Sequence, residues 1–254
     1  MSDTLSFTIQ FPLADGRTLV QGPLSYNADG LATRHSADFM RDPLFAEAYR
    51  LAMSTGHVFG PNLHVEWRIY VGCWIASNAI RLDGDFVECG VASGMLSRAI
   101  LHYVSWNPQS ERLFWLLDTF EGYPVEQLSE AERAAGLTSL TQVYDNSYER
   151  VQQTFAAYKS VQIVKGVIPS TLADITSERI AYLHLDCNAA APERAAIELL
   201  WDRLVPGAFI LMDDYGWAEC INQKMALDAF AASKGLRILS MPTGQGLLIK
   251  PNVI

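Results

Sequence analysis

The stretch Asp85-Phe-Val-Glu-Cys-Gly-Val-Ala-Ser-Gly-Met-Leu-Ser97 combines a short apolar run, an acid, two glycines and the start of a helical pattern. Phe86 and Val87 suit a buried strand, and Gly90 permits a tight turn directly after it. Gly94 would let the backbone approach a ligand. The stretch therefore predicts a strand, a ligand-binding loop and a helix, at the place where open α/β sheets hold nucleotides.

This loop departs from the dinucleotide-binding pattern. Ala92 stands where G-x-G-x-x-G requires its second glycine, so a pyrophosphate cradle is not expected. The carboxylate of Glu88 would repel an anion but attract an ammonium or a sulfonium group. This combination favours S-adenosylmethionine over NAD. The sequence leaves open the alternative that the two glycines serve only close packing of strand against helix.

The composition limits the class of protein. The chain has 254 residues, of which 50% are hydrophobic and 19% charged, as expected for one large α/β core. Its net charge of −9 and its lack of a Lys/Arg cluster argue against nucleic acid as a partner. The four cysteines form no C-x-x-C pair, which is typical of a reducing compartment. No leader-like start and no long apolar run is present, so the expectation is a cytoplasmic protein without a membrane partner.

The chain divides into residues 1–60, expected to form an N-terminal arm and cap segments, and residues 61–254, expected to form the catalytic domain. The first part predicts a β-hairpin or arm, followed by a helix broken at Asp42-Pro43. Residues 63–81 predict a long amphipathic helix that Asn62 would cap.

Apolar runs at residues 112–118, 161–164, 180–186 and 208–214 predict further buried parallel strands. Two final strands, joined by Pro242-Thr-Gly-Gln-Gly, predict a hairpin that makes the last strand antiparallel. The expected fold is therefore α/β and Rossmann-like, with a seven-stranded mixed sheet and helices on both faces. The long polar segment 125–146 predicts a lid over the substrate.

Four predicted strands end in acids, namely Glu88, Asp118, Asp186 and the pair Asp213-Asp214. Asp118 is placed to accept hydrogen bonds from ribose hydroxyls. Asp186, Asp213 and Asp214 would repel one another unless a cation joined them, which predicts Mg²⁺ or Mn²⁺. Such a metal could activate a substrate hydroxyl while a carboxylate removes its proton for attack on a methyl sulfonium. Alternatively, the Asp pair caps a turn and Asp186 contacts only the cofactor.

His184 lies two residues before Asp186 and so on the same face of a strand. It is a candidate base or substrate contact, and a buried, hydrogen-bonded histidine is the alternative interpretation.

Four motifs occur together and in order. They are Glu88-Cys-Gly-Val, Leu117-Asp-Thr-Phe-Glu-Gly122, Leu183-His-Leu-Asp186 and Leu204-Val-Pro-Gly-Ala-Phe-Ile-Leu-Met-Asp-Asp-Tyr-Gly216. With them, the chain resembles the macrocin-type (TylF/MycF) sugar O-methyltransferases. The resemblance implies a class I methyltransferase fold and Mg²⁺-assisted methyl transfer from S-adenosylmethionine to a sugar hydroxyl. The candidate cofactor contacts are Glu88, Gly90, Ser93, Gly94, Ser97, Asp118, Thr119 and Phe120. The implied metal ligands are Asp186, Asp213 and Asp214, with Asp186 and His184 as the catalytic candidates.

The chain also departs from that family. Cys187-Asn-Ala-Ala-Ala-Pro192 stands where the family has Gly-Asp and an aromatic-acid pair. We therefore expect a divergent branch that acts on a polysaccharide precursor or another glycoside. A homo-oligomer, such as a homodimer, is a possible assembly that the sequence does not decide. Two other functions remain open: a metal-dependent glycosyltransferase that uses a nucleotide sugar, and a noncatalytic cofactor-binding partner of a biosynthetic complex.

Overall fold

The structure is a computed structural model that describes residues 9–12, 18–21, 23–60, 62–122, 124–140, 144 and 146–252. The strands are β1 (Ile9–Pro12), β2 (Thr18–Gln21), β3 (Tyr26–Ala28), β4 (Leu31–Thr33), β5 (Asp85–Cys89), β6 (Phe114–Asp118), β7 (Val161–Lys165), β8 (Ile180–Leu185), β9 (Leu204–Met212), β10 (Leu239–Ser240) and β11 (Gly246–Ile249). The α-helices are α1 (Pro43–Met53), α2 (Glu66–Ala79), α3 (Met95–Tyr103), α4 (Glu130–Ala134), α5 (Leu137–Leu140), α6 (Tyr148–Phe155), α7 (Ala190–Leu200) and α8 (Ile221–Ser233).

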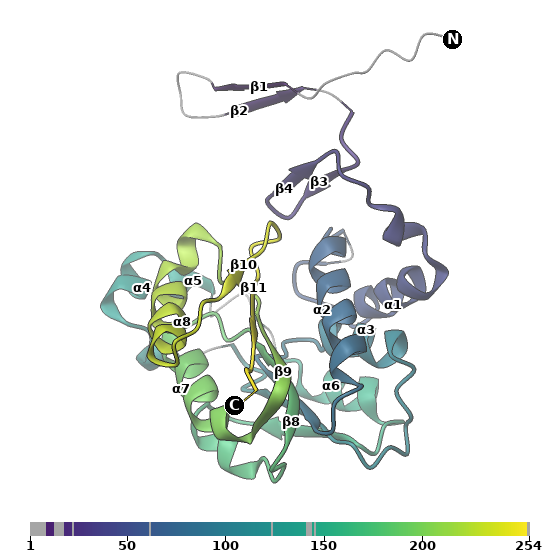
Figure 1. Cartoon of the computed structure of the whole chain (residues 1–254), viewed down its shortest axis with the longest axis vertical. Coiled ribbons are helices and arrows are strands. Elements are labelled where there is room, and N and C mark those ends of the chain that lie inside the picture. Colours follow the sequence, from purple (N-terminus) through teal and green to yellow (C-terminus); the bar gives the residue numbers. More distant parts are fainter. Residues whose placement is uncertain are drawn as a thin grey trace.

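One seven-stranded sheet dominates the molecule, with the strand order β10-β11-β9-β8-β5-β6-β7. Strands β5 to β9 run parallel, whereas β11 runs antiparallel to β9 and pairs with β10 as a hairpin. Figure 1 shows α1, α2 and α3 on one side of this sheet and α7 and α8 on the other. The predicted mixed sheet with an antiparallel last strand is confirmed.

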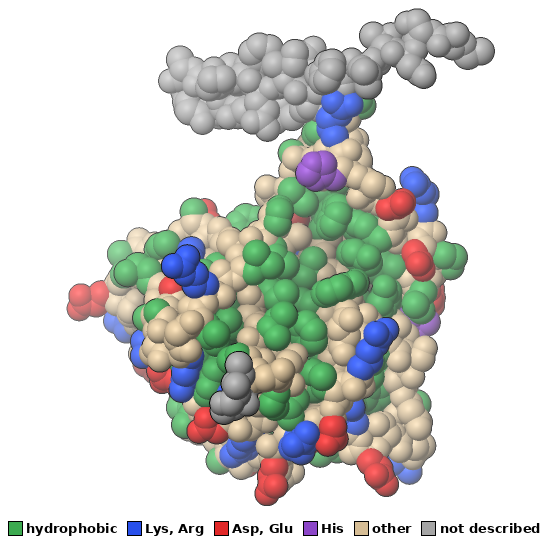
Figure 2. All heavy atoms as spheres, viewed as in Figure 1, with side chains coloured by type: hydrophobic (Ala, Val, Ile, Leu, Met, Phe, Trp, Pro, Cys, Tyr) green, Lys and Arg blue, Asp and Glu red, His purple; other side chains and the backbone are tan. Residues whose placement is uncertain are grey.

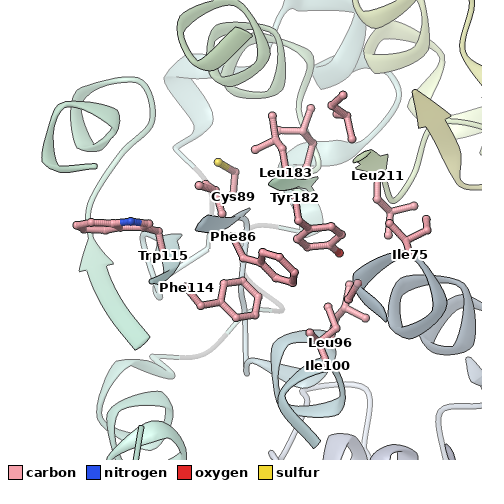
Figure 3. Packing of buried hydrophobic residues seen from close by; sticks show 14 of the residues in the cluster. Ile75, Phe86, Cys89, Leu96, Ile100, Phe114, Trp115, Tyr182, Leu183 and Leu211 are labelled. Carbon is pink, nitrogen blue, oxygen red and sulfur yellow. The ribbon is translucent and has the colours of Figure 1, made fainter. Parts of the chain in front are cut away.

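The core lies on both faces of the sheet because helices cover both of them, and its strands are accordingly apolar along their length. The rings of Phe86, Phe114 and Tyr182 point toward α2 and α3, where Figure 3 shows Ile75, Leu96 and Ile100. Side chains alternate along a strand, so Cys89, Trp115 and Leu183 point to the opposite face. The same alternation places Glu88 and His184 on the face that α2 and α3 cover.

Local sequence signals account for the helix starts. Asp42 caps α1 by accepting hydrogen bonds from the main-chain N–H groups of Leu44 at 2.8 Å and Phe45 at 3.3 Å. With Pro43 as its first residue, α1 follows a separate short 3-10 turn, so the predicted break is confirmed. Helix α2 begins later than predicted, because Val65 and not Asn62 precedes it and no side chain caps it.

The N-terminal part forms two hairpins, where the sequence predicted one hairpin or an arm. Strand β1 pairs antiparallel with β2, and β3 pairs antiparallel with β4. Helix α1 belongs to the main core, since Phe45, Ala48 and Ala52 are buried in it. The division of the chain at residue 60 stays a prediction.

The face drawn in Figure 2 carries many exposed hydrophobic side chains around β10, β11 and α2, with charged groups toward its margins. Trp74, Leu239 and Ile249 are among the large exposed hydrophobic residues. Apolar faces of this kind are typical of protein contacts, and a homodimer stays a possible assembly. Among the described residues, no helix combines the length and hydropathy needed to cross a bilayer.

Candidate active site

A pocket of about 820 Å³ opens at the carboxyl ends of β5, β6 and β8, the edge where parallel α/β sheets hold ligands. Six of the residues predicted from the sequence line it, namely Gly90, Ser93, Asp118, Thr119, Phe120 and Asp186. The structure thus brings the loop after β5, the tip of β6 and the tip of β8 around one cavity.

Asp118 fastens the loop that follows β5. Its Oδ2 accepts hydrogen bonds from the main-chain N–H groups of Val91 at 2.6 Å and Ala92 at 2.8 Å, and its Oδ1 accepts one from Phe120 at 2.6 Å. Ala92 takes a left-handed conformation, with φ of 48°. The carboxylate therefore shapes the pocket wall through the backbone, and its contact with a ribose stays a prediction.

The two glycines of the loop have different surroundings. Gly90 has φ of 89°, and a Cβ there would overlap the carbonyl oxygen of Asp186. Gly94 has φ of 79°, and a Cβ there would lie 2.6 Å from the ring of Phe155. Both serve close packing, as the alternative interpretation expects, and only Gly90 also lines the pocket.

Glu88 and Ser97 lie behind the pocket wall, between the sheet and α3. Glu88 is 2% exposed and accepts a hydrogen bond from the hydroxyl of Ser97. Burial raises the pKa of Glu88. None of Glu88, Gly94 and Ser97 lines the pocket, and each packs against another part of the chain. Their contact with a cofactor stays a prediction.

His184 lies between two carboxylates in the interior. Its Nδ1 is 3.3 Å from Glu88 Oε1 and its Nε2 is 3.6 Å from Asp213 Oδ1, with 1% of the side chain exposed. Burial alone would lower the pKa of His184, but the two carboxylates outweigh it and raise the pKa to about 10. The two carboxylates thus favour the protonated form of His184, and its contact with substrate stays a prediction.

The sequence analysis missed Arg68, which is buried in the first turn of α2. Arg68 forms ion pairs with Asp213, with Asp214 Oδ1 at 3.3 Å and with Asp29 Oδ2 at 3.1 Å. The sequence contained a signal that could have identified Arg68. This residue stands three positions after Val65 and four before Gly72, so it falls on the apolar side of the predicted helix. A positive charge on the buried side of a helix needs acidic partners.

The predicted metal ligands do not form an open metal site. Asp213 is bound by Arg68 and also accepts a hydrogen bond on Oδ1 from Gln245 Nε2 at 2.8 Å. Within the described part of the chain, no group of three His, Cys, Asp or Glu side chains is arranged to hold a metal ion. These residues as arranged do not fit a divalent cation, and Mg²⁺ stays a prediction from the sequence.

Asp186 is the acid of this group that lines the pocket. Burial and the neighbouring charges of Asp213 and Asp214 raise its pKa well above the ordinary value of an aspartic acid. A carboxylate with a raised pKa is a better proton acceptor near neutral pH. The place of Asp186 on the pocket wall is compatible with the predicted catalytic base, and this role stays a prediction.

The segment 125–146, predicted as a lid, lines the pocket with Gln127 and Tyr144, and the residues that flank it, Gly122, Pro124, Ser147 and Arg150, line the pocket as well. The side chain of Gln127 donates to the carbonyl of Ile168 at 2.6 Å, and Ser147 Oγ donates to the carbonyl of Ala92 at 2.6 Å. Glu132 of α4 accepts a hydrogen bond from the main-chain N–H of Ala190 at 2.8 Å. The segment is thus tied to three parts of the site, and its closure over an acceptor stays a prediction.

Glu193 supports the neighbouring wall. Its Oε1 accepts hydrogen bonds from the main-chain N–H of Cys187 at 3.0 Å and from Gln223 Nε2 at 2.8 Å. Both Cys187 and Asn188 line the pocket, and Asn188 has φ of 55°. The uncharged segment that departs from the family pattern therefore shapes the site.

Replacing Glu193 by Gln is expected to flatten the pH dependence of the free energy of unfolding. Burial raises the pKa of Glu193 from 4.5 to about 8, so between these values the folded state holds a proton that the unfolded state has released. Wild-type stability should then fall as pH rises through this window, by up to about 1.4 kcal/mol per pH unit. Urea unfolding from pH 5 to 8 measures this change in the free energy of unfolding. The control is Glu198→Gln, because Glu198 lies exposed on the same helix. Parallel profiles for wild type and Glu193→Gln would contradict the expectation.

The fold and the pocket at the carboxyl edge define a class I methyltransferase of the Rossmann-like type. The sequence pattern of macrocin O-methyltransferases (TylF) matches residues 73–239, more than half of the chain, so the chain belongs to this family.

Two curated proteins are similar in sequence. A tetracenomycin-C rhamnosyl 4'-O-methyltransferase from Streptomyces olivaceus is 32% identical over 148 residues, which cover 55% of this chain and 56% of that protein. The mycinamicin III 3''-O-methyltransferase from Micromonospora griseorubida is 26% identical over 150 residues, which cover 55% and 58%. The matched region thus spans little more than half the length of these relatives.

Solved structures show the same fold at lower identity. The O-methyltransferase NovP aligns over 85% of this chain and 98% of its own, with a TM-score of 0.66 and 21% identity. A calicheamicin methyltransferase aligns over 85% and 94%, with a TM-score of 0.61 and 15% identity. These likenesses confirm the predicted fold.

Proposed function

We propose that this chain transfers a methyl group from S-adenosylmethionine to a sugar hydroxyl of a glycoside. The observation that carries the proposal is Asp186, a carboxylate that lines the same pocket as the loop after β5. By their names, one of the relatives described above is an O-methyltransferase of a rhamnosylated tetracenomycin C, and the other is an O-methyltransferase of mycinamicin III. The proposal applies this activity to the present chain.

The transfer needs three things from the protein. The loop from Gly90 to Ser93 and the tip of β6 would hold the cofactor at one end of the pocket. Asp186 would take the proton of the acceptor hydroxyl as the oxygen attacks the methyl carbon and the carbon–sulfur bond breaks. The surrounding wall would hold acceptor and methyl group in line, about 3 Å apart, and exclude water.

The acceptor side of the pocket favours a neutral sugar. Cys187, Asn188 and Pro192 follow Asp186 in the chain and line the pocket with it, and none of them carries a charge. An anionic acceptor would be repelled by the Asp186 carboxylate at this wall, whereas Arg150, a cation that also lines the pocket, belongs to the wall around residues 122–150. We therefore propose a neutral glycoside, including an uncharged polysaccharide precursor, as the acceptor class.

The test combines binding and turnover. Calorimetric titration of S-adenosylhomocysteine should show one site, and incubation with S-adenosylmethionine and a panel of neutral and anionic glycosides should add one methyl group to a neutral member. Binding of a nucleotide sugar without binding of S-adenosylhomocysteine would contradict the proposal and favour a glycosyltransferase. Cofactor binding with no turnover on any glycoside would favour a noncatalytic partner.

Replacing Asp118 by Asn should weaken binding of S-adenosylhomocysteine by roughly 10–100-fold, the usual effect of losing hydrogen bonds to a charged group. The carboxylate now accepts hydrogen bonds from the main-chain N–H groups of Val91, Ala92 and Phe120. The amide of Asn has only one acceptor oxygen, so its NH₂ group would face at least one of these donors. The loop should open, and a direct cofactor contact would be lost with it. Calorimetry measures the change, with the exposed Asp174 changed to Asn as the control. Unchanged affinity would remove Asp118 from the cofactor site.

A further inference from the structure

We infer that the guanidinium of Arg68 takes the place of a divalent metal beside Asp213 and Asp214, so that this chain transfers its methyl group without a metal ion. The inference rests on the proposed methyltransferase function and concerns how that site compensates its negative charge.

One guanidinium joins the two adjacent acids. Its Nη1 contacts the carboxylate of Asp213, donates to the carbonyl oxygen of Asp213 at 3.0 Å and lies 3.3 Å from Asp214 Oδ1. Its Nε donates to Asp29 Oδ2 at 3.1 Å. Arg68 therefore already supplies the cation that the acids at the end of β9 require.

A metal and Arg68 cannot share these acids. A magnesium ion needs carboxylate oxygens at about 2.0–2.1 Å in near-octahedral order. One oxygen of Asp213 is bound by Arg68, and the other accepts from Gln245 at 2.8 Å and lies 3.6 Å from His184 Nε2. A divalent ion at this point would also meet the positive charge of Arg68. It could bind only if Arg68 withdrew.

Arg68 is not placed to withdraw. Its side chain is 9% exposed, and its Cζ lies 5.7 Å from the centre of the Trp217 ring. Asp29, in the turn of the β3–β4 hairpin, binds Arg68 from the N-terminal part of the chain. Arg68 does not line the pocket, whereas Asp186 does, so Arg68 is a positioning residue that acts through Asp213 and Asp214.

The decisive measurement is binding of Mn²⁺ to the full chain, followed by electron paramagnetic resonance of the free ion. Wild type should leave the signal of free Mn²⁺ unchanged, and so should the control Arg81→Met, an exposed arginine just beyond α2. Arg68→Met should bind one Mn²⁺, because its acids lose their cation, and the further change Asp213→Asn should abolish that binding. Wild-type turnover should be the same in EDTA as in Mg²⁺.

Stoichiometric Mn²⁺ binding by wild type that Asp213→Asn removes would overturn the inference. A folded Arg68→Met that binds no Mn²⁺ would overturn it as well. If Arg68→Met does not fold, the wild-type titration alone decides. Titration with S-adenosylhomocysteine on the same samples separates the two proposals, because failure to bind it removes the proposed function whatever Mn²⁺ does.

Discussion

Replacing Asp186 by Asn is expected to lower kcat for methyl transfer by roughly 10²–10⁴-fold, the contribution typical of a general base. The amide keeps the size of the side chain but cannot take a proton. Asp186 borders the pocket, and Asp213 and Asp214 next to it are held by Arg68 and cannot take over easily. Single-turnover methyl transfer to the glycoside identified in the panel measures the loss.

Binding of S-adenosylhomocysteine should change little in Asp186→Asn, because the base acts on the acceptor and not on the cofactor. Asp174→Asn, an exposed acid outside the pocket, provides the control for a lost carboxylate. Wild-type kcat in Asp186→Asn would show that another group accepts the proton. An equal loss of kcat and of cofactor affinity would point to a structural role instead.

Replacing Gly90 by Ala should lower the free energy of unfolding by at least roughly 3 kcal/mol, combining a left-handed backbone penalty with overpacking. The residue has φ of 89°, and an added Cβ would overlap the carbonyl oxygen of Asp186, an atom of the backbone that cannot rotate away. The two chain segments would have to separate, and Asp186 would move with them. Cofactor affinity and turnover should therefore fall together.

Gly136 is a matched control for this variant. It has φ of 87°, and a Cβ added there meets no described heavy atom within 4 Å. Gly136→Ala should thus cost only the backbone penalty, about 1–2 kcal/mol. Urea unfolding of the two variants isolates the steric part. Equal losses of stability would show that the contact between Gly90 and Asp186 is not tight.

The sequence was sufficient for the fold because its signals are local. Apolar runs, the cap formed by Asp42 and the turn before Gly246 each specify an element within a few residues, and handedness rules then restrict how the strands connect. For the same reason, acids at the ends of parallel strands could be assigned to one edge of the sheet. Asp118 and Asp186 indeed border one pocket.

What the acids do there was decided by tertiary structure. Arg68 reaches Asp213 across 145 positions of the chain, and Glu88 lies under α3 because its place in the strand alternation turns it from the pocket. Three carboxylates in sequence therefore indicated a metal, whereas in space a buried arginine holds two of them. The sequence by itself determined the sheet, its order of elements and the edge that carries the site. Only the packing of α2 against β9 determined which charges meet there, because electrostatic partners depend on distance in space and not along the chain.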